Sequence, residues 1–183
     1  ALGLSRPHMP FKAVLMAILI SPMIVPLIIT AAGMFFFYSK IGLTHTYLGL
    51  ILAHTALGTP FVVITVTATL TGFDTNLIRA SQSLGADTMR TFFKVIMPLI
   101  LPGVISGGLF AFITSFDEVV IVMFVGSVEQ ITIPKQMWAG LRQETSPVIL
   151  CMATCLVALS IALLTTVEML RRRSERLRGI KQR

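Results

Sequence analysis

The sequence predicts an all-α, polytopic membrane protein with about four transmembrane helices and a cytoplasmic helix between the second and the third. Hydrophobic residues make up 55% of its 183 residues, and the mean hydropathy is +0.86, both above the values of ordinary soluble domains. The apolar residues also gather in separate runs, and a helix needs ~20 residues to cross a bilayer. We therefore expect a single transmembrane domain over residues 1–183, with spans at about 13–38, 47–70, 98–125 and 149–170.

The first two runs contain residues that are uncommon in a straight apolar helix. Pro22 and Pro26 lie in the first run, which is longer than a span requires and has room for a kink. A kink that serves packing is the simpler interpretation, and a moving hinge is the alternative. The second run contains Pro60 and His54. A lone histidine in a span can line a pathway, but we favour a hydrogen-bonded packing residue.

The third run begins at Pro98 and contains Asp117 and Glu118 near its end. One charge at the bilayer centre costs about 2.5–3.5 kcal/mol, so an adjacent pair must face water, a positive partner or the outer surface. At ~1.5 Å per residue, a straight helix from Pro98 reaches Asp117 after about 28 Å, at the outer end of a span. Either the pair ends the helix at the interface, or it faces a cavity and meets a cationic solute. Close helix contact in this run is predicted at Gly103, Gly107 and Gly108.

Residues 71–97 form a long mixed polar and apolar segment between very apolar neighbours. Its first half can fold as an amphipathic surface helix near Leu77–Gly85, because apolar residues recur there at three- and four-residue spacing. Gly85 permits a turn or a close backbone approach, and Pro98 suits the first turn of the next helix. The predicted order is helix, glycine turn, helix, proline and membrane span.

The distribution of basic residues predicts the orientation in the membrane. Placing both ends and the 71–97 segment on one side puts 12 of the 15 Lys and Arg residues there, and basic loops stay in the cytoplasm. Seven of these residues lie after the last run. The 171–183 tail is therefore interpreted as an orientation anchor on anionic lipid, and we expect no nucleic-acid partner.

The sequence contains none of the common motifs for nucleotide binding, metalloprotease activity or serine hydrolase activity. It contains no G-x-x-x-x-G-K-[ST], no H-E-x-x-H and no G-x-S-x-G. Cys151 and Cys155 lie four residues apart in an apolar run, where small buried hydrophobes need no further role. We therefore expect no enzyme activity from the chain itself, no cofactor and no metal site.

The 71–97 segment resembles the cytoplasmic loop of permease subunits in bacterial ABC importers that use a solute-binding protein. The family pattern is Glu-Ala-Ala, three residues, Gly, nine residues, then Ile-x-Leu-Pro. Here 79–81 falls on the triplet, Gly85 on the glycine and 95–98 on the tail, with Arg79 and Ser81 departing from the usual Glu and Ala. In the family this loop carries the coupling helix that docks into the ATPase subunit. The resemblance assigns ATPase coupling to Arg79, Ala80, Ser81, Leu84, Gly85, Ala86 and Pro98.

Residues 58–74, 115–125 and 132–138 resemble spermidine/putrescine-type permeases in particular. The resemblance implies import of a polyamine-like cation across the bacterial inner membrane by alternating access, with Asp117 and Glu118 near the path. It also implies four partners: an ABC ATPase subunit that hydrolyses ATP, a second permease subunit, a periplasmic solute-binding protein and the lipid bilayer. The family core has one or two more helices at its start, and residue 1 is Ala. We therefore expect an N-terminally shortened chain.

Other functions remain open from the sequence. Within the same importer class, the solute could be an opine, thiamine or an iron complex. From another class, the rival is a homo-oligomeric channel or a membrane scaffold, which would bring only itself through a pull-down. A secondary transporter would need inverted repeats, which the sequence does not contain.

Overall fold

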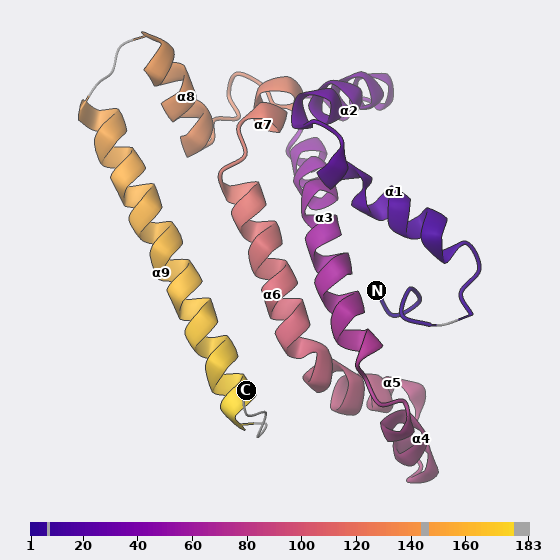
Figure 1. Cartoon of the computed structure of the whole chain (residues 1–183). Coiled ribbons are helices and arrows are strands. Elements are labelled where there is room, and N and C mark those ends of the chain that lie inside the picture. The colour runs from indigo at the N-terminus through magenta and orange to yellow at the C-terminus, as the bar shows by residue number, and fades with distance from the viewer. Residues whose placement is uncertain (7, 144–146, 178–183) are drawn as a thin grey trace.

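A computed structural model describes residues 1–6, 8–143 and 147–177, and every regular element in these ranges is a helix. Three long helices run side by side: α3 (Tyr47–Thr71), α6 (Met97–Phe116) and α9 (Pro147–Leu177). The 71–97 segment lies at one end of these helices, and α7 and α8 lie at the other (Figure 1). The expected all-α membrane fold is confirmed.

The first predicted span is two helices, α1 (Lys12–Ile24) and α2 (Leu27–Ile41), bent by 108°. Pro26 begins α2, and Val25 before it is extended, as a residue that precedes proline prefers. Length and composition alone allow three crossing helices in the described residues, or four if the bent pair is one span. The kink expected from the sequence is therefore present, but it is a sharp break.

The helices α3 and α6 pack closely because α6 presents glycines to α3. A Cβ at Gly107 would stand 2.8 Å from Val62 Cα and closer still to the Thr65 hydroxyl, and one at Gly103 would collide with Thr69. Bare glycine backbone thus allows a contact that any side chain would block. The third glycine, Gly108, faces open space instead, so its predicted role in packing is wrong.

The third predicted span is also divided. Helix α6 ends at Phe116, and the short helix α7 (Val120–Val125) follows after a break. Three residues of α7 are fully buried against α2 and α3 and make the main core at this end of the molecule: Ile121, Val122 and Val125. A charged pair inside an apolar run therefore marks the end of one helix and the start of another.

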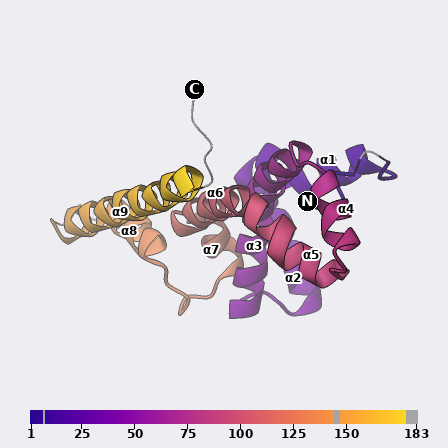
Figure 2. The same cartoon turned by 90° about the horizontal axis from the view of Figure 1, so that it is seen from below.

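The last two helices are α8 (Ile133–Gln143) and α9, and α9 covers the predicted span at 149–170. Helix α9 packs beside α6, and its last turns lie at the same end of the molecule as the 71–97 segment (Figures 1 and 2). Of the expected basic tail, 171–177 continues α9. Residues 178–183 lie outside the described part of the chain.

Candidate functional site

The 71–97 segment folds as the sequence predicts, into a helix, a glycine turn and a second helix. Helix α4 (Asn76–Ser83) is followed, after a turn, by α5 (Thr88–Thr91). Helix α5 then continues without a break through a π-helical turn (Phe92–Ile96) into α6. Pro98 therefore sits in a continuous helix, in the first turn of α6. The part of α6 that crosses the membrane is thus a direct extension of this segment.

Gly85 makes the turn after α4. Its φ is +81°, in the left-handed region that glycine enters most easily. The Gly85 amide donates to Gln82 O at 2.9 Å, and the Ala86 amide donates to Ser81 O at 3.1 Å. These two bonds are the Schellman pair that satisfies the last carbonyls of a helix. The position of Gly85 in the sequence pattern therefore predicted a turn whose backbone conformation needs glycine.

Side chains then fix α5 against α4. The Asp87 carboxylate accepts the Arg90 amide at 2.8 Å and caps α5. The Ser81 and Thr91 hydroxyls, one from each helix, are hydrogen-bonded at 3.0 Å. Thr91 is only 2% exposed, so this link is protected from water. These contacts hold the helix pair together at the end of the molecule.

The outer surface of this unit exposes large apolar side chains among polar and charged ones. Leu84 is 89% exposed, and Leu77, Met89 and Phe93 are exposed as well. Beside them, Gly85, Asp87, Arg90 and Lys94 contribute to the lining of a hollow of about 520 Å³. Of the residues assigned to coupling, Arg79, Ala80, Leu84, Gly85 and Pro98 are exposed, while Ser81 and Ala86 are half-buried.

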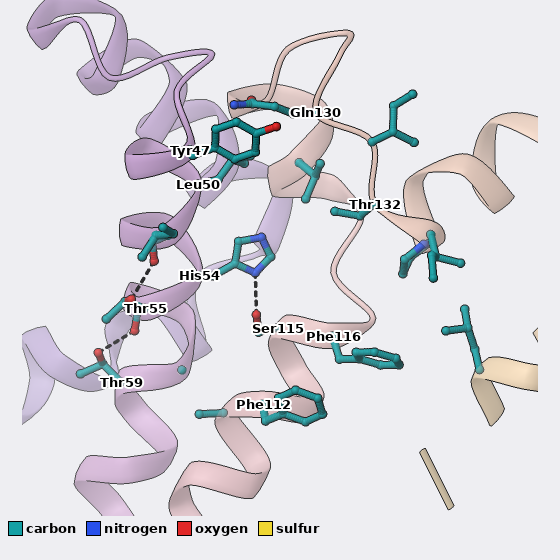
Figure 3. Close-up of a pocket in the computed structure, with 18 of the residues that line it drawn as sticks. Tyr47, Leu50, His54, Thr55, Thr59, Phe112, Ser115, Phe116, Gln130 and Thr132 are labelled. Carbon is teal, nitrogen blue, oxygen red and sulfur yellow. Dashed lines mark hydrogen bonds between the residues drawn. The ribbon is translucent and has the colours of Figure 1, made fainter. Parts of the chain in front are cut away.

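A second candidate site is a pocket of about 910 Å³ between α3, α6 and the segment that joins α7 to α8 (Figure 3). We call it the α3–α6 pocket. Its walls are mostly apolar and include Phe112 and Phe116, whose rings stack at 5.5 Å. The polar residues of the lining are Tyr47, His54, Thr55, Thr59, Ser115, Glu129, Gln130 and Thr132.

Some polar groups of this pocket already have a hydrogen-bond partner within the protein, and others are open to a solute. The Thr55 and Thr59 hydroxyls each donate to a carbonyl one turn earlier in α3, both at 2.7 Å. His54 Nδ1 is hydrogen-bonded to Ser115 Oγ at 2.9 Å, which joins α3 to α6. Among the residues that line the pocket, Glu129 is the carboxylate, and its side chain is exposed. Such a mixture suits a solute with cationic and aliphatic parts.

A hydrogen-bonded loop closes one side of the pocket. Lys135 Nζ donates to Ser127 O at 2.9 Å and to Gln130 O at 3.2 Å. His45 Nδ1 donates to Gly126 O at 3.1 Å, and the side-chain Nε2 of Gln130 donates to His45 O at 3.4 Å. Glu129 thus stands on a loop that is anchored on both sides.

The acid pair occupies the break between α6 and α7. Glu118 is 6% exposed, and its Oε1 accepts the Ile121 amide at 2.8 Å, at the start of α7. Asp117 is exposed, and its amide completes α6 by donating to Ile113 O at 3.3 Å. Neither acid lines the α3–α6 pocket. The interpretation of the pair as a helix end is confirmed, and its contact with a solute stays a prediction.

Sequence reasoning missed most of the α3–α6 pocket. His54 was expected to be a hydrogen-bonded packing residue; the bond is present, but the residue also lines the pocket. Its partner Ser115 lies 61 positions away, and Glu129 lies in a polar loop that showed no motif. Polar residues at 54, 55 and 59, on one part of a predicted membrane span, were the signal that could have indicated a polar face on α3.

Comparisons with known proteins give a consistent result. A family model described as "Binding-protein-dependent transport system inner membrane component" matches residues 1–176. The chain is 30% identical to the spermidine/putrescine transport system permease protein PotC of Haemophilus influenzae, over 95% of this chain and 68% of the relative. It is 28% identical to PotC of Escherichia coli K12, over 94% and 65%.

A related protein of Escherichia coli K12, the putrescine transport system permease protein PotI, is 29% identical over 75% of this chain and 51% of its own length. The chain thus spans about two thirds of the length of the spermidine/putrescine relatives.

Proposed function

The chain belongs to the family of binding-protein-dependent transport system inner membrane components, and from this premise we propose that it is a permease subunit of an ABC importer for a polyamine-like cation. The observation that carries the proposal is its similarity, along 94–95% of its length, to permeases named for spermidine and putrescine. In this proposal a separate ATPase subunit hydrolyses ATP, a second permease subunit completes the pathway, and a solute-binding protein delivers the cation.

The 71–97 segment is the proposed contact with the ATPase. Its exposed apolar residues, Leu84, Met89 and Phe93, provide surface that a protein partner can bury. Because α5, the π-helical turn and α6 are continuous, displacement of this segment moves α6 as a whole. The proposed motion reaches the α3–α6 pocket through Phe112, Ser115 and Phe116. Coupling requires that the ATPase contacts differ between the two states of the importer.

Within the acid pair, Asp117 is the proposed contact of the cation. Glu118 is buried and already accepts a backbone amide, so its carboxylate has a structural task at α7. Asp117 is exposed, and its carboxylate caps neither helix.

The proposed orientation places both ends and the 71–97 segment in the cytoplasm. The last turns of α9 lie at the same end of the molecule as that segment (Figure 1). Ala1 packs on the cluster of Val66, Leu70 and Ile100, near the same ends of α3 and α6. Both observations agree with the positive-inside count of Lys and Arg.

Transport by the assembled importer tests the proposal. The chain would be co-expressed with its ATPase, second permease and binding protein and reconstituted into proteoliposomes. We expect ATP-dependent accumulation of labelled spermidine or putrescine. Accumulation of an opine, thiamine or an iron complex instead would keep the importer class and reject the substrate. Purification of the chain alone, as a homo-oligomer that conducts ions, would reject the importer itself.

A further inference from the structure

His54 has the geometry of a solute contact as well as of a helix-packing residue. It is half-buried in α3 and lines the α3–α6 pocket. Its Nδ1 is held by Ser115 at 2.9 Å, which fixes the orientation of the ring. The other ring nitrogen, Nε2, points away from Ser115 on the side where Tyr47 lies (Figure 3). Among the described residues, Nε2 has no hydrogen-bond partner.

Ser115 lets the ring offer an acceptor to the pocket. A serine hydroxyl both donates and accepts, so it can accept a hydrogen bond from Nδ1–H. The neutral ring then carries its lone pair on Nε2. A primary ammonium has three N–H donors and no acceptor, and it is the chemical partner that such a nitrogen suits.

The pocket supplies the rest of such a site. Glu129 brings a carboxylate on a loop fixed by Lys135, and the stacked rings of Phe112 and Phe116 form an apolar wall. A cation gains from the carboxylate and from aromatic faces, and methylene groups gain from the apolar wall.

We propose that the α3–α6 pocket is a binding site for an alkylammonium group of the solute, in which His54 Nε2 accepts an ammonium N–H, Ser115 positions the ring, and Glu129 balances the charge. This inference rests on the proposed import of a cation, and it adds a site separate from the acid pair at 117–118. His54 contacts the solute, whereas Ser115 acts through His54 as a positioning residue.

Two substitutions separate this role from a purely structural one. In His54→Asn the short amide reaches the Nδ1 position, so it keeps the bond to Ser115 but leaves no acceptor at the Nε2 position. In His54→Gln the longer amide reaches the Nε2 position, so it keeps an acceptor in the pocket and gives up the bond to Ser115. A solute contact requires that Gln transports better than Asn. A packing role alone requires the reverse.

The measurement is uptake of labelled spermidine by the complete importer in proteoliposomes, at saturating loaded binding protein. Loss of one hydrogen bond to a charged group should lower uptake about tenfold in His54→Asn, with a smaller loss in His54→Gln. Assembly with the ATPase and second permease, measured by size-exclusion chromatography, should be retained in both. If Asn equals or exceeds Gln, the inference is overturned.

Dependence on pH gives a second readout. A protonated ring cannot accept an ammonium and also repels it, so wild-type uptake should fall on acidification more steeply than that of His54→Gln. The charged and titratable groups near the ring are Glu118, which interacts with it electrostatically, and Glu129 and Tyr47 in the pocket. All three remain in both proteins, so their own titration contributes to both profiles, and the ratio reports the protonation of the His54 ring. Parallel profiles would overturn the inference.

Uptake by the wild-type importer separates a failure of the proposed role of His54 from a failure of the proposed substrate class. If wild type accumulates spermidine and the order of the variants is reversed, only the role of His54 fails. If wild type accumulates no cation, the proposed substrate class fails, and the inference fails with it.

Discussion

At the scale of single residues, Gly85 shows how one backbone conformation can define a surface. A Cβ at this position would have no atom within 4 Å, so the space around Gly85 does not require glycine. The requirement comes from φ at +81°, where an L side chain meets its own backbone. The direction in which α5 leaves α4 therefore depends on this residue.

Replacing Gly85 by Val should uncouple ATP hydrolysis from transport. The left-handed conformation costs about 1–2 kcal/mol for an L residue and is worse for a β-branched one, so the turn and the docking surface should shift. We expect uptake per ATP hydrolysed to fall severalfold in reconstituted importer. Gly85→Asn is the matched control, because Asn tolerates positive φ, and it should keep more of the coupling. Normal coupling in a well-expressed Val variant would contradict the role of the turn.

Arg79 is exposed on α4 at the place where the family pattern has Glu. Because an exposed ion pair contributes about 0–1 kcal/mol, Arg79→Glu should change the affinity for the ATPase by less than about tenfold. Binding of the purified ATPase to the permease pair, measured by surface plasmon resonance at two salt concentrations, provides the check. Complete loss of association would instead reveal an ion pair on which docking depends.

At the scale of helices, two prolines four residues apart have opposite outcomes. Pro22 cannot donate to Ile18 O, but the Ser21 hydroxyl bonds that carbonyl at 2.8 Å, and α1 continues. Pro26 begins a new helix at 108° to the first. The sequence predicted a kink from the prolines, but both residues look alike in it. At Pro22 a neighbouring hydroxyl takes the place of the backbone donor that proline lacks.

The contact between α3 and α6 gives a prediction with a built-in control. Gly107→Ala places a methyl group 2.8 Å from Val62 Cα, and backbone cannot move aside as a side chain does. We expect a loss of about 1–3 kcal/mol in stability. Gly108→Ala adds the same methyl group to open space and should be neutral or slightly stabilising.

Thermal unfolding of the detergent-solubilised complex compares these two variants directly. The Gly107 variant should unfold at a lower temperature than wild type, and the Gly108 variant should not. Equal midpoints for the two variants would show that the helices separate easily at this contact.

At the scale of the whole molecule, the two candidate sites lie at opposite ends of α6. The 71–97 segment could be predicted from the sequence, because its turn needs glycine at position 85 and because Pro98 is tolerated in the first turn of α6. The α3–α6 pocket could not, since it is formed by residues such as His54, Ser115 and Glu129 that only the packing of α3, α6 and the α7–α8 loop brings together. Local backbone needs leave a pattern in sequence, and tertiary contacts between distant positions do not.

The acid pair at the end of α6 gives a prediction about the route of the cation through the molecule. Asp117→Asn and Glu118→Gln preserve size and remove charge, and Gln keeps an oxygen for the Ile121 amide that Glu118 now accepts. If Asp117 meets the cation, its variant should lower spermidine uptake about tenfold, the loss expected for one charged hydrogen bond, while assembly stays intact. The Glu118 variant should have a smaller effect.

The effect should also weaken for a neutral analogue of the solute, because the lost interaction is electrostatic. Uptake of both solutes, each normalised to the amount of assembled complex, measures this difference. If both variants transport at the wild-type rate, the pair serves only to end α6 and start α7. Recognition of the cation would then have to come from the α3–α6 pocket, where Glu129 is the carboxylate of the lining.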